Sequence, residues 1–280
     1  MTRLETAAGD VFSAARQCLD AADPQDKVAL TQHYAAAFAR GALSIPAHAP
    51  APVPIGMPGR PARPALVHPR HLRKRGLGSV EGRAAFLHAI AHIELNAIDL
   101  AWDAVYRFRG LPDAFYADWV GVARDESRHF ALLRGRLQAF GYDYGDFDAH
   151  NGLWEMCEKT AHDGLARMAL VPRVLEARGL DVTPGMIAKL RALGDDETVR
   201  ILELILREEV PHVAAGSRWY RWYCARQGVE PRATFLQLLR DYAGPYLRGP
   251  FNVQARLLAG FEQEELDALV ALEPPRLPGS

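Results

Sequence analysis

The chain has 280 residues, 49% hydrophobic and 24% charged, a composition typical of a globular protein and too apolar for a disordered one. Its formal net charge of −1 at pH 7 argues against broad electrostatic binding to nucleic acid or an anionic membrane. No run of 18 apolar residues and no basic, then apolar, N-terminal segment is found, so we expect neither a membrane span nor a secretory signal. The three cysteines are few and far apart, which predicts reduced thiols in a cytoplasmic protein.

The first 78 residues are predicted to form two different parts. Residues 1–45 are predicted to form two short helices. The second should begin at Asp23-Pro24, because Asp23 can cap a helix and Pro24 fits its first turn. Residues 46–78 contain eight prolines, so we expect an extended, irregular strap. Because apolar residues interrupt it, the strap should lie on the surface of the rest of the protein.

A hairpin of two long helices should follow, the first starting near Ser79 and the second ending near Phe140. Glu94 lies inside the apolar stripe of the first helix. Glu126 and His129 lie inside the stripe of the second. The break at Gly110-Leu111-Pro112 is 16 residues from both glutamates, measured from Gly110, so the hairpin places them at one height.

A second hairpin is expected from a third helix over 151–178 and a fourth over about 196–227, which carries Glu209 and His212. Gly179 and Thr183-Pro184 should interrupt the third helix, and a shorter helical piece should follow to Leu193. Short helices joined by turns at Gly244-Pro245 and Gly249-Pro250 should complete an all-α chain. The predicted domains are an N-terminal helical appendage (1–45), the strap (46–78), an antiparallel four-helix bundle (79–228) and a helical tail covering the bundle (229–280).

The spacing of acids and histidines predicts a metal site. Glu126-Ser-Arg-His129 and Glu209-Val-Pro-His212 each place a carboxylate and an imidazole on one helix face. Glu94 precedes the first pair by 32 residues and Glu176 precedes the second by 33, which puts each glutamate opposite its pair on the previous helix. Four carboxylates and two histidines are the ligand set of a dinuclear iron or manganese site in a four-helix bundle.

Glu176 is the least certain of these ligands, because the helix face around it is mixed. Asp163 and His162 are rival donors from the same predicted helix. The predicted ligands are Glu94, Glu126, His129, Glu176, Glu209 and His212.

Two acids next to the ligands suggest a second layer of contacts. A metal-bound imidazole usually donates its other N–H to a carboxylate. We therefore expect Asp125 to orient His212 and Glu208 to orient His129, the alternative being that both acids only face solvent. Pro211 should produce a kink or a π-bulge beside the metals, or else a tolerated bend without function.

Four segments resemble a bacterial ferritin-like family of unknown function over roughly residues 5–270. They are His92-Ile-Glu-Leu followed by Ala-Ile-Asp-Leu, Asp125-Glu-Ser-Arg-His-Phe130, the stretch from Ala166 to Asp181, and Glu208-Glu-Val-Pro-His212. The resemblance implies a ferritin-like four-helix bundle. Glu176-Ala-Arg178 is similar to the third-helix ligand motif of ferritin-like tRNA hydroxylases, which favours Glu176 over Asp163.

Two functions fit this reading. The first is an O2-activating di-iron oxidoreductase that oxidises or hydroxylates an unknown small molecule, with two iron ions, or manganese or a mixed pair, and with an electron-donor protein as a further partner. The alternative is a non-enzymatic protein that binds, oxidises, stores or senses iron. Storage shells use nearly bare four-helix subunits, whereas this chain carries about 78 residues before the bundle and about 50 after it. We therefore favour the enzyme, as a cytoplasmic monomer or small homo-oligomer without nucleic-acid or membrane partners.

Overall fold

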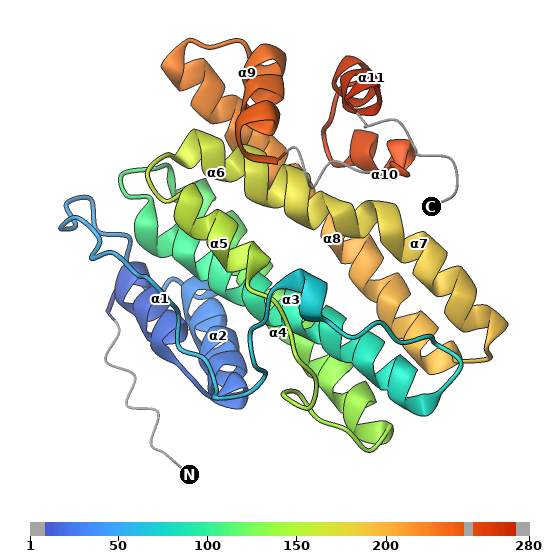
Figure 1. The fold of residues 1–280 in the computed structure, drawn as a ribbon. Helices are drawn as coiled ribbons and strands as arrows, with labels where there is room; N and C mark the ends of the chain where they lie inside the picture. The colour runs from blue at the N-terminus through green and yellow to red at the C-terminus, as the bar shows by residue number, and fades with distance from the viewer. Residues whose placement is uncertain (1–8, 244–248, 273–280) are drawn as a thin grey trace. The chain divides into compact units, whose positions relative to one another are not determined.

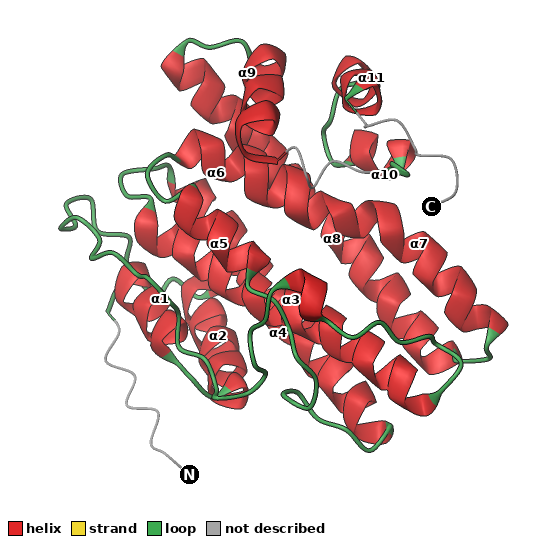
Figure 2. Ribbon diagram, in the orientation of Figure 1, coloured by secondary structure: helices red, strands yellow, loops and turns green. Residues whose placement is uncertain are grey.

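Residues 9–243 and 249–272 are described by the computed structural model, and within them the chain is helical, with two isolated β-bridges and no strand (Figures 1 and 2). The chain divides between Glu155 and Met156 into two compact units. Each predicted hairpin falls in a different unit. The turn predicted at Gly244-Pro245 lies outside the described residues.

Unit 1 contains the first four helices. They are α1 (Val11–Asp20), α2 (Pro24–Ala39), α3 (Val80–Arg107) and α4 (Asp113–Ala139). The α3 and α4 helices form an antiparallel hairpin, with α1 packed on α3 and α2 on α4 (Figure 1). Asp23 accepts hydrogen bonds from the N–H groups of Gln25 (2.7 Å) and Asp26 (3.2 Å), and Pro24 opens α2, so the predicted helix start is confirmed.

The Pro-rich segment is irregular except for η1 (Pro69–His71), and it is tied to unit 1 by backbone hydrogen bonds. The Gly59 N–H donates to the Leu19 carbonyl (2.7 Å), and the Val67 N–H donates to the Ala149 carbonyl (2.8 Å). The indole of Trp154 donates to the Gly56 carbonyl (2.7 Å). This Pro-rich strap therefore lies against the rest of unit 1.

The interior of unit 1 contains a buried ion pair. Lys27 on α2 pairs with Asp99 on α3, and their side chains are 1% and 2% exposed. The Lys27 ammonium also donates to the Cys18 carbonyl (3.0 Å). Because each charge faces the other, neither is left uncompensated in the apolar interior.

Unit 2 begins within α5 (Gly152–Lys159) and is built on a long helical hairpin. Its elements are α6 (Gly164–Leu170), the π-helical turn η2 (Val171–Glu176), α7 (Ala177–Ala192), α8 (Asp196–Gln227), α9 (Pro231–Leu238), the π-helical turn η3 (Leu239–Ala243), α10 (Val253–Leu258) and α11 (Gln263–Ala271). Gly194, with φ of +73°, turns the chain between α7 and α8. The α6–η2–α7 segment runs along α8 (Figure 1).

The prediction for the third helix was wrong in two respects. Instead of one helix over 151–178, the chain breaks after Lys159 and restarts at Gly164, because Asp163 caps α6 by accepting from the Leu165 N–H (2.9 Å). Instead of stopping at Gly179 and Pro184, the helix continues through both as α7. Packing on α8 outweighs the helix-breaking tendency of these residues.

The described part of the tail is attached to unit 2 by two arginines. Arg256 forms a two-pronged ion pair with Asp181 of α7 (2.9 and 2.7 Å). Arg173 of η2 is buried, donates to Glu265 of α11 (2.7 Å) and stacks on the ring of Phe235 at 4.2 Å. These contacts hold α10 and α11 against the α6–η2–α7 segment.

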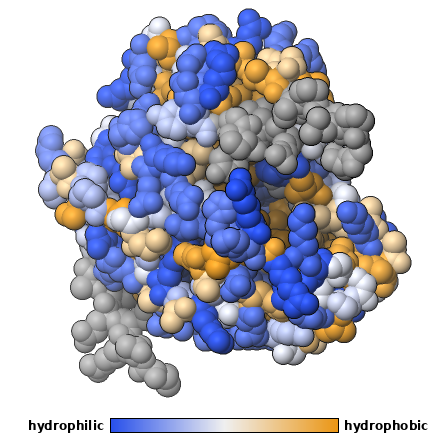
Figure 3. All heavy atoms as spheres, in the orientation of Figure 1, coloured by the Kyte–Doolittle hydropathy of each residue, from blue (hydrophilic) through white to orange (hydrophobic). Residues whose placement is uncertain are grey.

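One helix, α3, is long and apolar enough to cross a membrane, although the sequence predicted none. Of its most apolar 18-residue window, 72% is buried inside the protein, which favours a core helix. The large exposed apolar side chains, such as Val53 of the strap and Ile93 of α3, belong to several elements. On the face shown in Figure 3, orange apolar residues are interspersed with blue hydrophilic ones.

Candidate metal centre

Three predicted ligands meet inside unit 1. Glu94 of α3 and Glu126 and His129 of α4 offer ligand atoms that all lie within 4.8 Å of one another. The His129 Nδ1 atom is 3.2 Å from Glu94 Oε2 and 3.4 Å from Glu126 Oε2. Glu126 and His129 face the same side of α4 because they are three residues apart. The hairpin brings Glu94 opposite them, as the spacing of 32 residues predicted.

This group is buried, with Glu94, Glu126 and His129 only 5%, 2% and 0% exposed. Burial, and then the charge of Glu126, raise the pKa of Glu94 well above its usual value. Burial by itself lowers the pKa of His129, but hydrogen bonds to Glu126 and Glu94 and their charges outweigh it and raise that pKa to about 11. Both shifts favour retention of a proton within this group of three side chains.

The donor set fits a divalent cation. Ligand atoms bonded to one metal ion at about 2.0–2.2 Å lie roughly 3.0–3.6 Å apart, as 90–110° bond angles require. The two His129–carboxylate distances, 3.2 and 3.4 Å, fall in this range. Two carboxylates and one imidazole are ligands that iron, manganese and zinc accept. The buried Glu/His group can therefore hold a metal ion, and its donors alone do not decide which one.

A polar network lies next to this group and includes residues that the sequence did not single out. The His92 Nε2 atom lies 3.0 Å from the His150 carbonyl and 3.1 Å from the Asn96 side-chain nitrogen, and Nδ1 lies 2.8 Å from the Tyr144 hydroxyl. Burial lowers the pKa of His92 to about 3, which keeps the ring neutral. Tyr144 also stacks edge-on against Phe130, the neighbour of His129 (5.3 Å). No local pattern marks Tyr144, because it comes from the loop after α4.

The second Glu-x-x-His pair lies in unit 2. Glu209 and His212 of α8 are 9% and 3% exposed, and His212 Nδ1 is 3.4 Å from Glu209 Oε2, the same separation as in the first pair. A Cβ atom on Gly179 of α7 would lie 3.9 Å from Glu209 Cγ. The hairpin of α7 and α8 thus presents a second carboxylate–imidazole pair. That the two pairs share one dinuclear site stays a prediction.

Glu176 is the last residue of η2 and is partly buried. Among the described residues it belongs to no group of three donors close enough for one metal ion. The π-helical turn contains more residues per turn than an α-helix, so a count of 3.6 per turn does not give the direction of Glu176. This explains the mixed face of the sequence around it.

Asp163 and His162, the two alternatives to Glu176 as a metal ligand, lie before α6. Asp163 caps α6, and His162 is exposed. At Pro211 the sequence left open a kink, a π-bulge or a tolerated bend. The α8 helix is α-helical through this proline, so the π-bulge is absent there, and a π-helical turn occurs at Pro172 instead. Pro172 packs directly on α8, because a Cβ atom added to Gly216 would lie 2.4 Å from Pro172 Cβ.

Asp125 and Glu208 are the two acids that the sequence predicted to contact the ligand histidines. Asp125 pairs within α4, with Arg124 at 3.0 Å and Arg128 at 3.6 Å, and lies toward the helix surface. Glu208 is half-buried on α8. Their expected bonds to His212 and His129 stay predictions.

The fold and site define a class, an all-helical protein with a buried Glu/His group able to hold a metal ion. The chain belongs to the family described as Protein of unknown function (DUF455), which matches residues 20–267. It is also similar to a Haemophilus influenzae protein described as uncharacterized, with 48% identity over 222 residues, 76% of each chain. No solved structure matches the chain. The predicted membership of a family of unknown function is confirmed.

Proposed function

We propose that this protein is a cytoplasmic di-iron oxidoreductase of ferritin-like fold that uses O2 to oxidise or hydroxylate a small organic substrate. The observation that carries the proposal is the buried group of Glu94, Glu126 and His129. Two buried carboxylates that repel one another are costly unless a cation joins them. The second pair, Glu209 and His212, supplies matching donors for a second ion.

Each residue has a defined task in this proposal. Glu94, Glu126 and His129 would hold one ion, and Glu176, Glu209 and His212 the other. Bound iron would supply the redox chemistry with O2. Burial of the ligands limits access of water, and the carboxylates supply the negative charge that offsets the cations. His129 would hold the ion through a deprotonated nitrogen, so it would have to give up any proton there.

Metal analysis of the whole chain tests the ligand set. Protein loaded anaerobically with Fe(II) should bind about two ions per chain, as six such ligands do in four-helix bundles. Glu126→Gln should lose at least one ion. Glu158→Gln, which removes an exposed glutamate of α5, is the matched control and should bind as many as the unchanged protein. Binding of less than one ion to the unchanged protein would contradict the proposal.

Reaction with O2 separates the enzyme from an iron store. The reduced, loaded protein should consume O2 about once per site and then stop when no reductant is added. A store would continue to oxidise added Fe(II) far beyond two ions per chain and would form a large shell. Mineral formation together with a shell in size-exclusion chromatography would refute the enzyme and leave the ligand assignment intact.

A further inference from the structure

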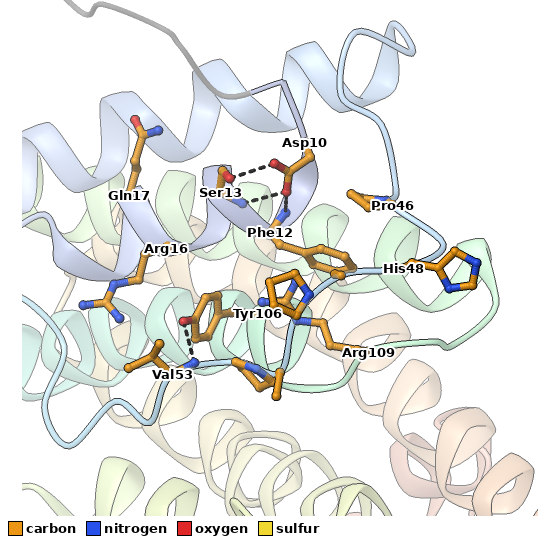
Figure 4. Close-up of a pocket in the computed structure, with 14 residues that line it drawn as sticks. Asp10, Phe12, Ser13, Arg16, Gln17, Pro46, His48, Val53, Tyr106 and Arg109 are labelled. Carbon is orange, nitrogen blue, oxygen red and sulfur yellow. Dashed lines mark hydrogen bonds between the residues drawn. The ribbon is translucent and has the colours of Figure 1, made fainter.

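A pocket of about 610 Å³ lies in unit 1, at the opposite end of α3 from its N-terminus. It is lined by the start of α1, by strap residues between Pro46 and Val53, by Tyr106 near the end of α3, and by Arg109 just after that helix (Figure 4). Glu94 is 12 residues before Tyr106 on the same helix, roughly 18 Å along its axis, so the pocket is separate from the metal centre. Its volume is within the range of small-molecule sites.

The pocket has hydrogen-bond donors without acceptors. Arg109 Nε is buried and has no hydrogen-bond partner among the residues that the structure describes. The Tyr106 oxygen accepts from the Val53 N–H (3.1 Å), and no described residue accepts from the Tyr106 hydroxyl. A buried donor without an acceptor is costly. A ligand in the pocket would meet Arg109 through the part of its guanidinium that lines the pocket and through its positive charge.

The acids near the pocket are already engaged. Asp10 accepts from the Phe12 and Ser13 N–H groups (2.9 Å each) and from the Ser13 hydroxyl (2.7 Å). Arg16 pairs with Asp20 (2.6 Å). Burial lowers the pKa of Arg109, and the charge of Asp10 is among the effects that oppose it. Arg109 nevertheless forms no ion pair with any residue that the structure describes.

Most of the remaining wall is apolar, although Ser13, Gln17 and His48 also line the pocket. The Arg109 guanidinium lies over the ring of Phe12, 3.7 Å from the ring centre, and 5.0 Å from the ring centre of Tyr106. Pro46, Pro50 and Pro52 of the strap close the other side. Figure 4 shows Tyr106 and Arg16 on the same side of the pocket as Val53. An anion with an apolar body fits these walls better than a fully hydrated ion.

We propose that this pocket binds a small organic carboxylate, whose anionic end meets Arg109 and Tyr106 and whose apolar body lies against Phe12 and the strap prolines. The assignment is independent of the metal and of the proposed oxidoreductase activity. It gives the strap a role in binding, because the strap supplies one wall of the site.

Nuclear magnetic resonance of the arginine Nε–H groups tests the proposal with three probes: benzoate, inorganic phosphate and benzyl alcohol. The Arg109 signal is assigned as the one missing in Arg109→Gln. Benzoate should shift it at concentrations up to roughly 10 mM, a range suited to so small a ligand. Phosphate lacks the apolar body and benzyl alcohol lacks the charge, so both should bind more weakly than benzoate.

Variants complete the test. Benzoate affinity, followed through the probe's own signals, should fall about tenfold or more in Arg109→Gln, because a charge-assisted hydrogen bond is lost. Arg73→Gln removes an exposed strap arginine outside the pocket and should bind like the unchanged protein. If Arg109→Gln does not fold, Tyr106→Phe, which removes only the hydroxyl, should still weaken binding severalfold. Absence of benzoate binding, equal binding of any other probe, or undiminished binding in these pocket variants would overturn the proposal.

Discussion

Gly216 of α8 is where the contact between η2 and α8 is most easily tested. A Cβ atom at this position would lie 2.4 Å from both Cβ and Cγ of Pro172. Carbon atoms normally approach to about 3.5–4.0 Å, so Gly216→Ala demands a displacement of roughly 1 Å. The proline ring cannot rotate out of the way, because it is closed onto its own backbone.

The expected magnitude follows from two opposing effects. Replacing a helical glycine by alanine stabilises a helix by about 1 kcal/mol. Overpacking a buried contact costs about 1–3 kcal/mol, and a clash of the new methyl group with a rigid ring belongs at the upper end. We expect Gly216→Ala to lower the free energy of unfolding by about 2 kcal/mol. Gly185→Ala on α7, where the added Cβ meets nothing within 4 Å, should raise it by up to about 1 kcal/mol.

Urea unfolding followed by circular dichroism measures the free energy of each variant. Hydrogen exchange of peptides covering residues 164–192 shows where the change occurs, and exchange should accelerate there in Gly216→Ala. The reasoning would be refuted if Gly216→Ala were as stable as Gly185→Ala and exchanged like the unchanged protein.

Three further predictions concern the buried charges. Lys27→Met should lower the free energy of unfolding by about 3–5 kcal/mol, because it leaves Asp99 buried without its cation, and Lys27→Met combined with Asp99→Leu should restore much of the loss in urea unfolding. Glu176→Ala should lose one bound metal ion in metal analysis, while Asp163→Ala should keep both; the reverse result would show that Asp163 is the ligand. Burial lowers the pKa of His88 to about 4, so the unfolded chain takes up a proton between about pH 6.5 and 4 and the folded one does not. The protein should lose up to about 3 kcal/mol over this interval, and His88→Gln should flatten the pH dependence in unfolding measurements; an unchanged slope would contradict the assignment.

The His88 prediction rests on its hydrogen bond. His88 Nε2 accepts from the Gly145 N–H (2.9 Å), an interaction that a protonated ring cannot make. The ring also stacks on Tyr144 at 5.1 Å. Asp146 and Asp148 oppose the effect of burial by raising the pKa of His88. The side-chain amide introduced by His88→Gln still offers an acceptor to Gly145, so the comparison isolates titration.

The sequence predicted α3, α4 and α8 well, because each is long and keeps one apolar stripe with a period of 3.6 residues. The same regularity placed Glu94 opposite Glu126 and His129, and the structure brings these three together. The number of residues between two ligands on neighbouring helices of a hairpin can be counted directly in the sequence. No knowledge of the tertiary structure is needed for that prediction.

The third segment could not be predicted by the same counting. A capped break at Asp163, a π-helical turn at Val171–Glu176 and a proline inside α7 each depend on packing against α8 or the tail. The pocket could not be predicted from the sequence either. It depends on a contact between the strap and α3, where the Val53 N–H donates to the Tyr106 hydroxyl 53 residues later in the chain. Contacts of this kind leave no periodic signal.

The hydrogen bond between Trp154 and Gly56 joins residues 98 positions apart and has a consequence for synthesis on the ribosome. Trp154 is fully buried, so unit 1 is not complete until this residue has been translated and has left the exit tunnel. Until then the strap lacks its hydrogen bond at Gly56, although the Gly59 N–H can already donate to the Leu19 carbonyl. Unit 1 therefore finishes folding only as the ribosome proceeds into unit 2.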